Sequence, residues 1–372
     1  MSLRPLSFRA TALLGLLVCL GSNAIAADHY DLKPQSIELT SSGPLAFGPS
    51  GILFASDPKA ATVYAIDTKS LRTQSKVDAT DYASDDVRKA IAEITAKSES
   101  DVTVADMAID PESGALFLSL AVAGEAKLAV MTPGVEAKLV SLDKVMAAST
   151  TLQNAPEDKV TGEGRRASNK RLESITDLAF AEGRLLISGL TGSSPVSTVQ
   201  SFEFPFRDPS TSAQVEIFHA AHGRNEDSAA IRAFIPLNID GKPSLLAGYT
   251  CTPLVRFSLD DLQSGNKVRG TTVAELGNRN RPLDMIVYEK DGVSYLLVTN
   301  TARGVMKMKA ADIADQAEVT DKVDGGGTAG LPFEQIESLT GVVQLAKLND
   351  QYAVILTETD SQSLKLSTIE LP

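Results

Sequence analysis

The chain has 372 residues, a formal net charge of −12 and a hydrophobic content of 43%. This acidity excludes nucleic acids and anionic membrane surfaces as partners, because both require a basic protein surface. A chain of this length and hydrophobicity can bury a large core, so we expect a globular protein that needs no disulfide bonds.

The first 26 residues have the pattern of a secretory signal peptide. Arg4 and Arg9 precede an apolar run at 12–20, and Ala24-Ile25-Ala26 supplies a small-x-small cleavage pattern. That run is too short for a membrane helix, and no later segment reaches the roughly eighteen apolar residues that such a helix needs. We therefore expect one soluble domain over 27–372, periplasmic or secreted, without membrane insertion. Cleavage would remove two of the 35 basic residues and none of the 47 acidic ones, so the mature net charge becomes −14.

Most of the mature chain repeats one β pattern. Each unit has a short apolar strand, a turn with glycine or Asn-Asp, a second apolar strand that ends in small or polar residues, and a third strand. The units begin near residues 44, 104, 174, 231, 281 and 340. A weak repeat of this kind predicts an all-β protein, a β-propeller with six legible blades. A seventh blade could lie within 144–173 or 190–220, and an open array of β-sandwiches is the alternative fold.

Two features at the ends of this pattern suggest how the ring closes. A strand predicted at 36–40 has no partner nearby in sequence, and the last unit ends without a fourth strand. Pairing these two segments would remove two open sheet edges, so we expect residues 36–40 to complete the last blade.

Two segments interrupt the repeats. A short amphipathic helix is predicted near 84–97, with Ser84 as its N-cap and Val87, Ile91 and Ile94 along one face. The stretch 152–174 is polar and has no periodicity, which predicts a surface loop, mobile or acting as a lid.

The repeats resemble those of known exported propellers. The fragments PLAF-GILFASD, DMAID-ALFLSL and YLLVTNT look like the repeats of YVTN-type and quinoprotein-like bacterial propellers. The run YTCTPLVRF…GTTVAELGNRNRPLDMIVY…RGVMK also resembles a group of secreted bacterial propellers without an established activity. The likeness covers most of 36–370 and supports fold more than function, because propellers host enzymes and binding platforms alike. The chain lacks tryptophan and a Cys-x-x-Cys-His motif, so tryptophan-docking repeats and covalent haem are excluded.

Three aspartates occupy matching places in the repeats. Asp106, Asp177 and Asp284 each stand at the first apolar strand of a unit, in ADMAI, TDLAF and LDMIV. If the units are blades, these carboxylates surround the central channel, where they could bind a ligand or a divalent metal such as Ca²⁺. The alternative is that each aspartate fixes its blade by hydrogen bonds to neighbouring backbone.

Two of the three histidines, His219 and His222, lie close together and near Glu226. On a continuous strand their side chains would point to opposite faces, so we expect the rings to diverge unless Ala220-Ala221 form a tight turn. With such a turn, the histidines and Glu226 would form a two-histidine, one-carboxylate set suited to Zn, Fe or Cu, with Cys251 as a softer fourth ligand. Contact with a substrate or partner and plain loop structure are the alternatives.

Arg279 and Arg281 stand among asparagines directly before a predicted inner strand. We expect them to line one ligand-binding mouth together with His219, His222 and Arg224, above the three aspartates. Such a mixed-charge mouth suits a small anionic ligand or a peptide carboxylate. An Arg–Asp network that holds blades together is the alternative.

These observations predict an exported soluble propeller that binds a small polar or anionic ligand or an exported protein partner. The alternative function is a metal-dependent enzyme or redox protein with its site at the channel mouth. No catalytic residue can be assigned, and the cofactor is unknown, with a divalent metal compatible with the side chains present.

Overall fold

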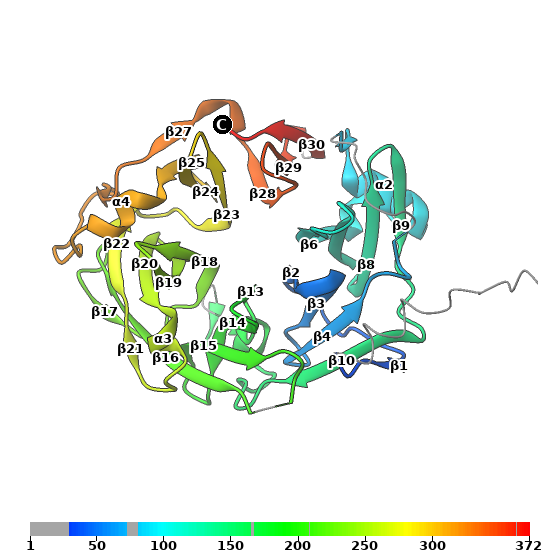
Figure 1. Cartoon of the computed structure of the whole chain (residues 1–372), viewed down its shortest axis with the longest axis horizontal. Coiled ribbons are helices and arrows are strands. Elements are labelled where there is room, and N and C mark those ends of the chain that lie inside the picture. The colour runs from blue at the N-terminus through cyan, green and yellow to red at the C-terminus, as the bar shows by residue number, and fades with distance from the viewer. Residues whose placement is uncertain (1–29, 73–80, 165–166, 208, 362) are drawn as a thin grey trace, which may run out of the picture.

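The computed structural model describes residues 30–72, 81–164, 167–207, 209–361 and 363–372. The predicted signal peptide lies outside these residues. Six sheets, antiparallel apart from one short parallel pair in blade 3, stand radially around a central channel, so the predicted six-bladed β-propeller is confirmed (Figure 1). The stretch 144–173 supplies one strand to blade 1 and a separate two-stranded hairpin, and 190–220 supplies strands to blade 3.

Blades 1 and 2 come from the first part of the chain. From the channel outward, blade 1 consists of β2 (Leu45–Phe47), β3 (Ile52–Asp57), β4 (Thr62–Asp67), β10 (Val145–Thr151) and β1 (Lys33–Gln35). In the same direction, blade 2 consists of β6 (Val102–Ile109), β7 (Leu116–Val122), β8 (Glu125–Thr132) and β9 (Val135–Leu139).

Blades 3 and 4 follow the 152–174 segment. Blade 3 consists of β13 (Asp177–Ala181), β14 (Arg184–Thr191), β15 (Val196–Glu203) and β16 (Thr211–His219), and β16 also pairs with β17 (Arg224–Glu226) and β21 (Val268–Arg269). Blade 4 consists of β18 (Ile231–Ile239), β19 (Lys242–Tyr249), β20 (Pro253–Ser258), β22 (Thr271–Glu275) and β26 (Ala329–Gly330), with the short helix α3 (Leu259–Leu262) after β20.

Blades 5 and 6 complete the ring. Blade 5 consists of β23 (Pro282–Lys290), β24 (Val293–Asn300), β25 (Gly304–Lys309) and β27 (Glu334–Ile336), with helix α4 (Ala310–Asp315) after β25. Blade 6 consists of β28 (Val342–Lys347), β29 (Tyr352–Glu358), β30 (Leu364–Glu370) and β5 (Ala83–Ser84).

The core lies between the blades, because the second strands are packed on both faces. All six residues of β3 are buried, and β7 is buried at every position except Ala121. Apolar side chains of neighbouring sheets form clusters, such as the one that joins Leu246 of blade 4 to Leu296 of blade 5. Strands buried on both faces read as continuous apolar runs, which is why each repeat showed an uninterrupted second strand.

The blades do not follow one another around the ring in chain order. Among the inner strands, β2 lies between β6 and β13, and β28 lies between β23 and β6. The ring order is therefore 1, 3, 4, 5, 6, 2. The chain builds blade 2 on one side of blade 1, returns along the outside of blade 1 as β10, and continues with blade 3 on the other side (Figure 1).

The predicted ring closure is wrong. Residues 36–40 form no strand, and the neighbouring strand β1 pairs with β10 in blade 1. The outer strand of blade 6 is β5, which pairs Ser84 with Leu366. The reason is the ring order: blade 2 lies next to blade 6, so the chain that leads into blade 2 can supply the outer strand of blade 6.

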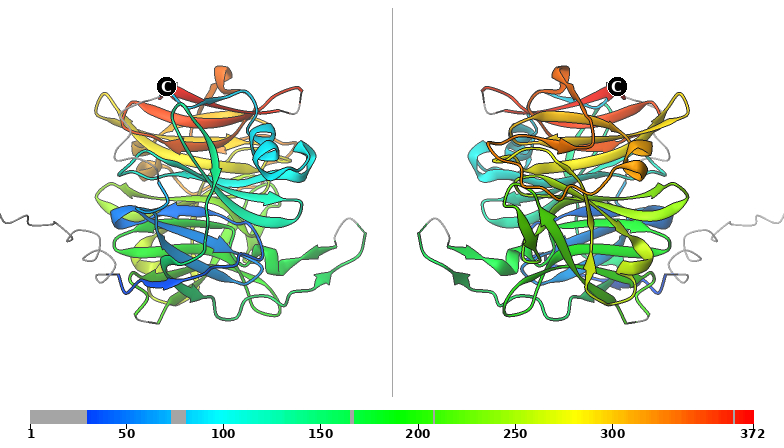
Figure 2. Two further views of the ribbon diagram at one scale, coloured as in Figure 1. Left: turned by 90° about the vertical axis from the view of Figure 1, so that its right-hand side faces the viewer. Right: turned by 90° about the vertical axis from the view of Figure 1, so that its left-hand side faces the viewer.

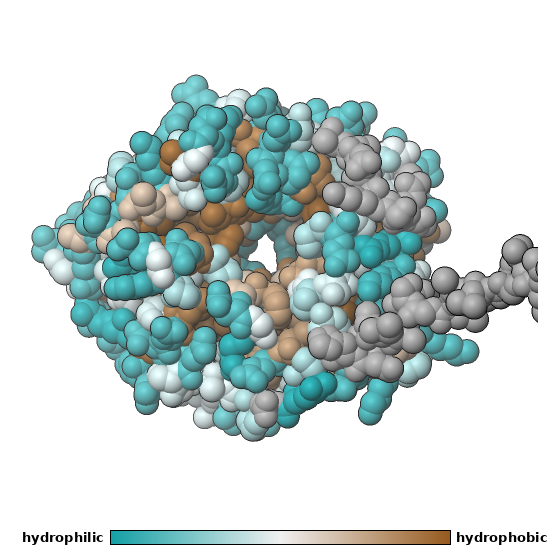
Figure 3. Space-filling view, viewed as in Figure 1, coloured by the Kyte–Doolittle hydropathy of each residue, from teal (hydrophilic) through white to brown (hydrophobic). Residues whose placement is uncertain are grey.

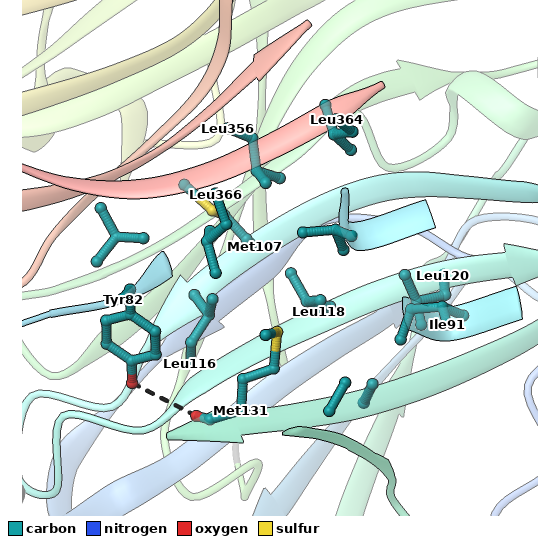
Figure 4. Close-up of a cluster of buried hydrophobic side chains, with 14 of the residues drawn as sticks. Tyr82, Ile91, Met107, Leu116, Leu118, Leu120, Met131, Leu356, Leu364 and Leu366 are labelled. Atoms are coloured by element: carbon teal, nitrogen blue, oxygen red, sulfur yellow. Dashed lines mark hydrogen bonds between the residues drawn. The ribbon is translucent and has the colours of Figure 1, made fainter. Parts of the chain in front are cut away.

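A cluster of apolar side chains holds this closure together (Figure 4). Leu356, Leu364 and Leu366 of blade 6 pack with leucines of β7 in blade 2 and with Tyr82, which precedes β5. The Tyr82 hydroxyl donates to the carbonyl of Met131 at 3.4 Å, and the Tyr82 backbone N–H donates to Thr368 Oγ1 at 2.8 Å.

The predicted helix is present as α2 (Val87–Thr95), which is shorter than expected. Ser84 belongs to β5, and the cap is Asp86, whose carboxylate accepts the backbone N–H groups of Arg88 and Lys89. No helix in the described part of the chain is long and apolar enough to cross a membrane.

The 152–174 segment contains a two-stranded hairpin, β11 (Val160–Thr161) with β12 (Ser168–Asn169), followed by a 3-10 turn at Lys170–Glu173. Figure 2 shows this hairpin projecting away from one face of the propeller. Its base is attached to blade 1, because the Arg171 guanidinium donates to the carbonyl of Lys59 at 2.9 Å.

Candidate functional site

The first residues of the inner strands surround a cavity of about 460 Å³ in the central channel. Every blade contributes to the lining, and the lining residues include Pro44, Ala105, Thr176, Arg232, Leu283 and Val343, one from each blade. Figure 3 shows the central opening of the channel on one face of the molecule.

β-Bulges direct four of these six side chains into the channel. The register of the inner strand against its neighbour shifts at Ala105, Arg232, Leu283 and Val343. A bulge adds one residue to a strand and re-aims its side chain. Arg232 therefore faces the cavity although it lies within the apolar strand β18. Sequence analysis missed Arg232, and an alignment of the six units at this position would have found it.

The three predicted aspartates line the same cavity, and each joins two blades. One carboxylate oxygen accepts the backbone N–H of an inner strand in the next blade at 2.7 Å: Asp106 from Leu45, Asp177 from Phe234 and Asp284 from Leu345. The other oxygen of Asp177 and of Asp284 accepts the N–H of the following residue. These bonds cross every second blade boundary, which gives the channel an approximate threefold pattern.

Burial and mutual repulsion shift the proton affinity of these carboxyls. Burial raises the pKa of Asp106 to about 7, against the opposing effect of its two backbone hydrogen bonds. Burial and the charge of Asp106 raise the pKa values of Asp177 and Asp284 well above the usual range. Each aspartate thus accepts backbone N–H groups, as in the alternative in which these residues hold the blades together.

Two arginines, Arg232 and Arg281, line the same cavity as the three aspartates. Arg232 binds Glu173 at 3.3 Å and Thr250 Oγ1 at 3.1 Å. Arg281 also lines the cavity, and its guanidinium has no hydrogen-bond or ion-pair partner among the described residues. Burial and the neighbouring charge of Arg232 lower the pKa of Arg281. The Arg–Asp network considered from the sequence is thus not formed by Arg281.

The other predicted mouth residues do not line the cavity. Arg279 is exposed in the turn before β23, with a left-handed backbone at φ 60°. His219, His222 and Arg224 lie where β16 ends and β17 begins, and none of them lines the cavity. The two regions are nevertheless adjacent, because the Cys251 N–H donates to the carbonyl of Asn280 at 2.8 Å. The sequence hypothesis of a single mouth is replaced by two neighbouring sites.

The second site is built on a hairpin. Strand β16 ends at His219, the chain turns with hydrogen bonds from the N–H groups of His222 and Gly223 to the His219 carbonyl, and β17 returns antiparallel. His219 pairs with Arg224, and Ile217 with Glu226. Directly opposite residues share a face of an antiparallel pair, so His219 and Glu226 lie on the same side as neighbours.

The expectation that the two histidine rings diverge is wrong. Their centroids are 3.9 Å apart, because the turn at 220–223 reverses the chain before strand alternation can separate them. The Glu226 carboxylate accepts from His219 Nδ1 at 2.7 Å and from His222 Nδ1 at 2.9 Å. Burial lowers the pKa of His219, and Glu226 partly offsets that effect. Burial alone would raise the pKa of Glu226, but the hydrogen bonds from His219, Arg224 and His222 bring it below its ordinary value.

Cys251 completes this group from the turn between β19 and β20. One ligand atom each of His219, His222 and Cys251 lies within 4.8 Å of the other two. Cys251 and Thr252 both have left-handed backbones, at φ 64° and 56°. Consecutive non-glycine residues in this region are energetically costly, and such strain gathers at functional sites.

Glu275 is a second residue that sequence analysis missed. It is fully buried at the end of β22 and accepts the N–H groups of Ala221 at 3.1 Å and Gly277 at 3.3 Å. Burial raises the pKa of Glu275 to about 7. The glutamate thereby fixes the histidine-bearing turn of blade 3 against blade 4.

No protein-family model matches the chain, and no curated protein matches it in sequence. Among solved structures it is similar to a mitotic checkpoint complex chain, at 10% identity, 99% coverage of both chains and a TM-score of 0.36. It is also similar to a thermostable family-43 glycoside hydrolase, at 9% identity, 72% of this chain, 89% of that chain and a TM-score of 0.38. A PQQ-bound aldose sugar dehydrogenase from Streptomyces coelicolor has 12% identity over 91% of this chain and 96% of its own, with a TM-score of 0.34. Similarity at this level carries no argument about function.

Proposed function

We propose that the protein is an exported binding protein that holds a small anionic ligand at the channel mouth. Arg281 carries this proposal. Its guanidinium faces a cavity, has no partner among the described residues and lies near a second cation, Arg232. Like charges that approach one another are unfavourable, and an anion between them would remove that cost.

The surroundings suit a small carboxylate better than a cation. Within the cavity, Glu173 is bound by Arg232 and Lys170, and Glu358 by Arg88. The aspartates below have raised pKa values, so near neutral pH they repel an anion less than free carboxylates would. A volume of about 460 Å³ lies in the range of small-molecule sites, and guanidinium groups bind carboxylates in a planar, bidentate geometry.

The test is calorimetric titration with citrate, with the neutral sugar glucose as the uncharged probe. Arg281→Ala should weaken citrate binding roughly 10- to 100-fold, because a hydrogen bond to a charged group contributes about 1.5–3 kcal/mol. Arg279→Ala is the matched control: it removes an equal charge two residues away but leaves the cavity lining intact. Equal losses in both variants, or no citrate binding by the wild type, would contradict the proposal and favour a protein partner.

Export is part of the proposal and has its own test. It is supported by the basic, apolar and small-residue pattern of residues 1–26. N-terminal sequencing of protein recovered from the exported fraction should begin at Ala27. A cytoplasmic protein that keeps its first 26 residues would exclude export.

A further inference from the structure

We propose that His219, His222 and Cys251 bind one transition-metal ion, and that Zn²⁺ is the ion their donor set suits best. Imidazole nitrogen and thiolate sulfur are preferred zinc ligands. Three such donors lie within 4.8 Å of one another, although they come from two different blades and two different turns. A small contraction brings them to the spacing of a tetrahedral site, where the metal–nitrogen bonds are about 2.0–2.1 Å.

The orientation of the two imidazoles supports metal binding. Nδ1 of each ring is hydrogen-bonded to the same carboxylate, Glu226, so in the neutral imidazole the proton lies on Nδ1 and Nε2 is available as a ligand. A carboxylate behind a histidine ligand fixes its tautomer and raises its basicity. The sequence hypothesis placed Glu226 on the metal itself. The structure instead gives it the supporting position behind both histidines.

An unpartnered buried atom points to a missing ligand at this place. His219 is only 2% exposed, and its Nε2 has no hydrogen-bond partner within the described structure. A buried polar atom without a partner is unfavourable, so such atoms are rare and call for a physical cause. A metal ion bound by His219 Nε2 would satisfy it, and the His222 ring lies close by, with its centroid 3.9 Å from that of His219.

The donors also indicate which class of metal fits. Ca²⁺ and Mg²⁺ require oxygen ligands, whereas a set of two nitrogens and one sulfur selects zinc or copper. The His222 side chain is 44% exposed and Cys251 is partly exposed, so the fourth coordination position faces solvent. Three protein ligands with an open position is the arrangement found in zinc sites that bind a water or a substrate atom.

Zinc binding is tested on the full mature protein, which is stripped with a chelator, reloaded with excess ZnCl₂ and dialysed to remove unbound ion. We expect one equivalent of Zn²⁺ per chain by elemental analysis, and a thiolate-to-cobalt charge-transfer band when Co²⁺ replaces it. Cys251→Ser should abolish that band, and His222→Ala should abolish stoichiometric binding. Glu226→Gln should weaken zinc binding roughly 10- to 100-fold, since it removes only the support of the ligands.

Matched controls distinguish this site from zinc bound elsewhere on the chain. Asp227→Asn changes the next carboxylate in the chain, which binds Lys267 and Gln214 instead of the histidines, and should leave zinc affinity unchanged. His29→Ala, which removes the third histidine of the chain, should also leave zinc affinity unchanged. Zinc that survives both Cys251→Ser and His222→Ala, or a wild type that binds no stoichiometric Zn²⁺ or Cu⁺, would overturn the proposal. Circular dichroism shows whether each variant is folded, and citrate binding by Arg281 is measured independently.

Discussion

The channel aspartates predict that acid stabilises this protein near neutral pH, and Asp106→Asn tests the prediction. Burial raises the pKa of Asp106 in the folded chain to about 7, above its ordinary value of 3.8. The folded state therefore binds more protons than the unfolded state between these two values, and stability falls as pH rises through that window. Asparagine does not titrate, so the variant lacks this contribution.

The magnitude follows from the shift. One pKa unit corresponds to about 1.4 kcal/mol, so between pH 8 and pH 5 Asp106 should contribute about 1–3 kcal/mol of pH-dependent stability. Asp106 also raises the pKa values of Asp177 and Asp284, so its removal weakens their contributions in the same direction. Asparagine can accept only one of the two backbone hydrogen bonds, so the comparison rests on the slope of stability against pH and not on the absolute stability of the variant.

Urea unfolding followed by circular dichroism at pH 5, 6, 7 and 8 measures the effect, since the chain has no tryptophan for fluorescence. The wild type should gain stability relative to Asp106→Asn as the pH falls from 8 to 5. Thr103→Val, an uncharged change at the same cavity, should follow the wild type. Parallel pH profiles for wild type and Asp106→Asn would refute the reasoning, because they would mean that the carboxyl is not desolvated by the blades.

Two further predictions concern ring closure. Asp86→Ala should lower the free energy of unfolding by about 1–2 kcal/mol, because it removes a helix N-cap that also accepts the N–H of Leu364 in blade 6. Asp85→Ala, at the exposed neighbouring position, should lower the free energy of unfolding much less. Equal losses for the two variants in urea titrations would contradict the capping role of Asp86. Tyr82→Ala should lower the free energy of unfolding by about 3–5 kcal/mol, because the Tyr82 side chain is only 3% exposed and packs between blades 2 and 6. A melting temperature close to that of the wild type would show that the β5 segment does not close the ring.

Local patterns were enough to predict the class of fold. Each second strand, such as β3 or β24, is buried on both faces, and this burial selects an apolar run that is visible in the sequence. The turns between strands require glycine or asparagine at fixed places, so six units could be counted. The amphipathic helix at Val87–Thr95 was also visible, although its cap was assigned two residues early.

The ring order and closure depend on contacts that no local pattern records. Tyr82 and Thr368 are 286 residues apart in sequence yet bonded through backbone and side chain. The sequence showed an unpaired strand and an incomplete last blade, but edge pairing is satisfied by any available strand, so the pattern alone could not select β5 over residues 36–40. The packing of blade 2 against blade 6 places β5, and not residues 36–40, at the outer edge of blade 6.

In the candidate sites too, local sequence pattern and tertiary contacts determine different features. The sequence by itself determined which residues have suitable chemistry: three aspartates at equivalent strand positions, a histidine pair near Glu226, and Arg281 before an inner strand. Tertiary structure decided which of them meet. A four-residue turn reverses the chain after β16 and brings the two histidine rings together, and Cys251 reaches them from a different blade. Strand alternation describes side-chain direction only while a strand continues, and the structure shows that β16 ends at His219.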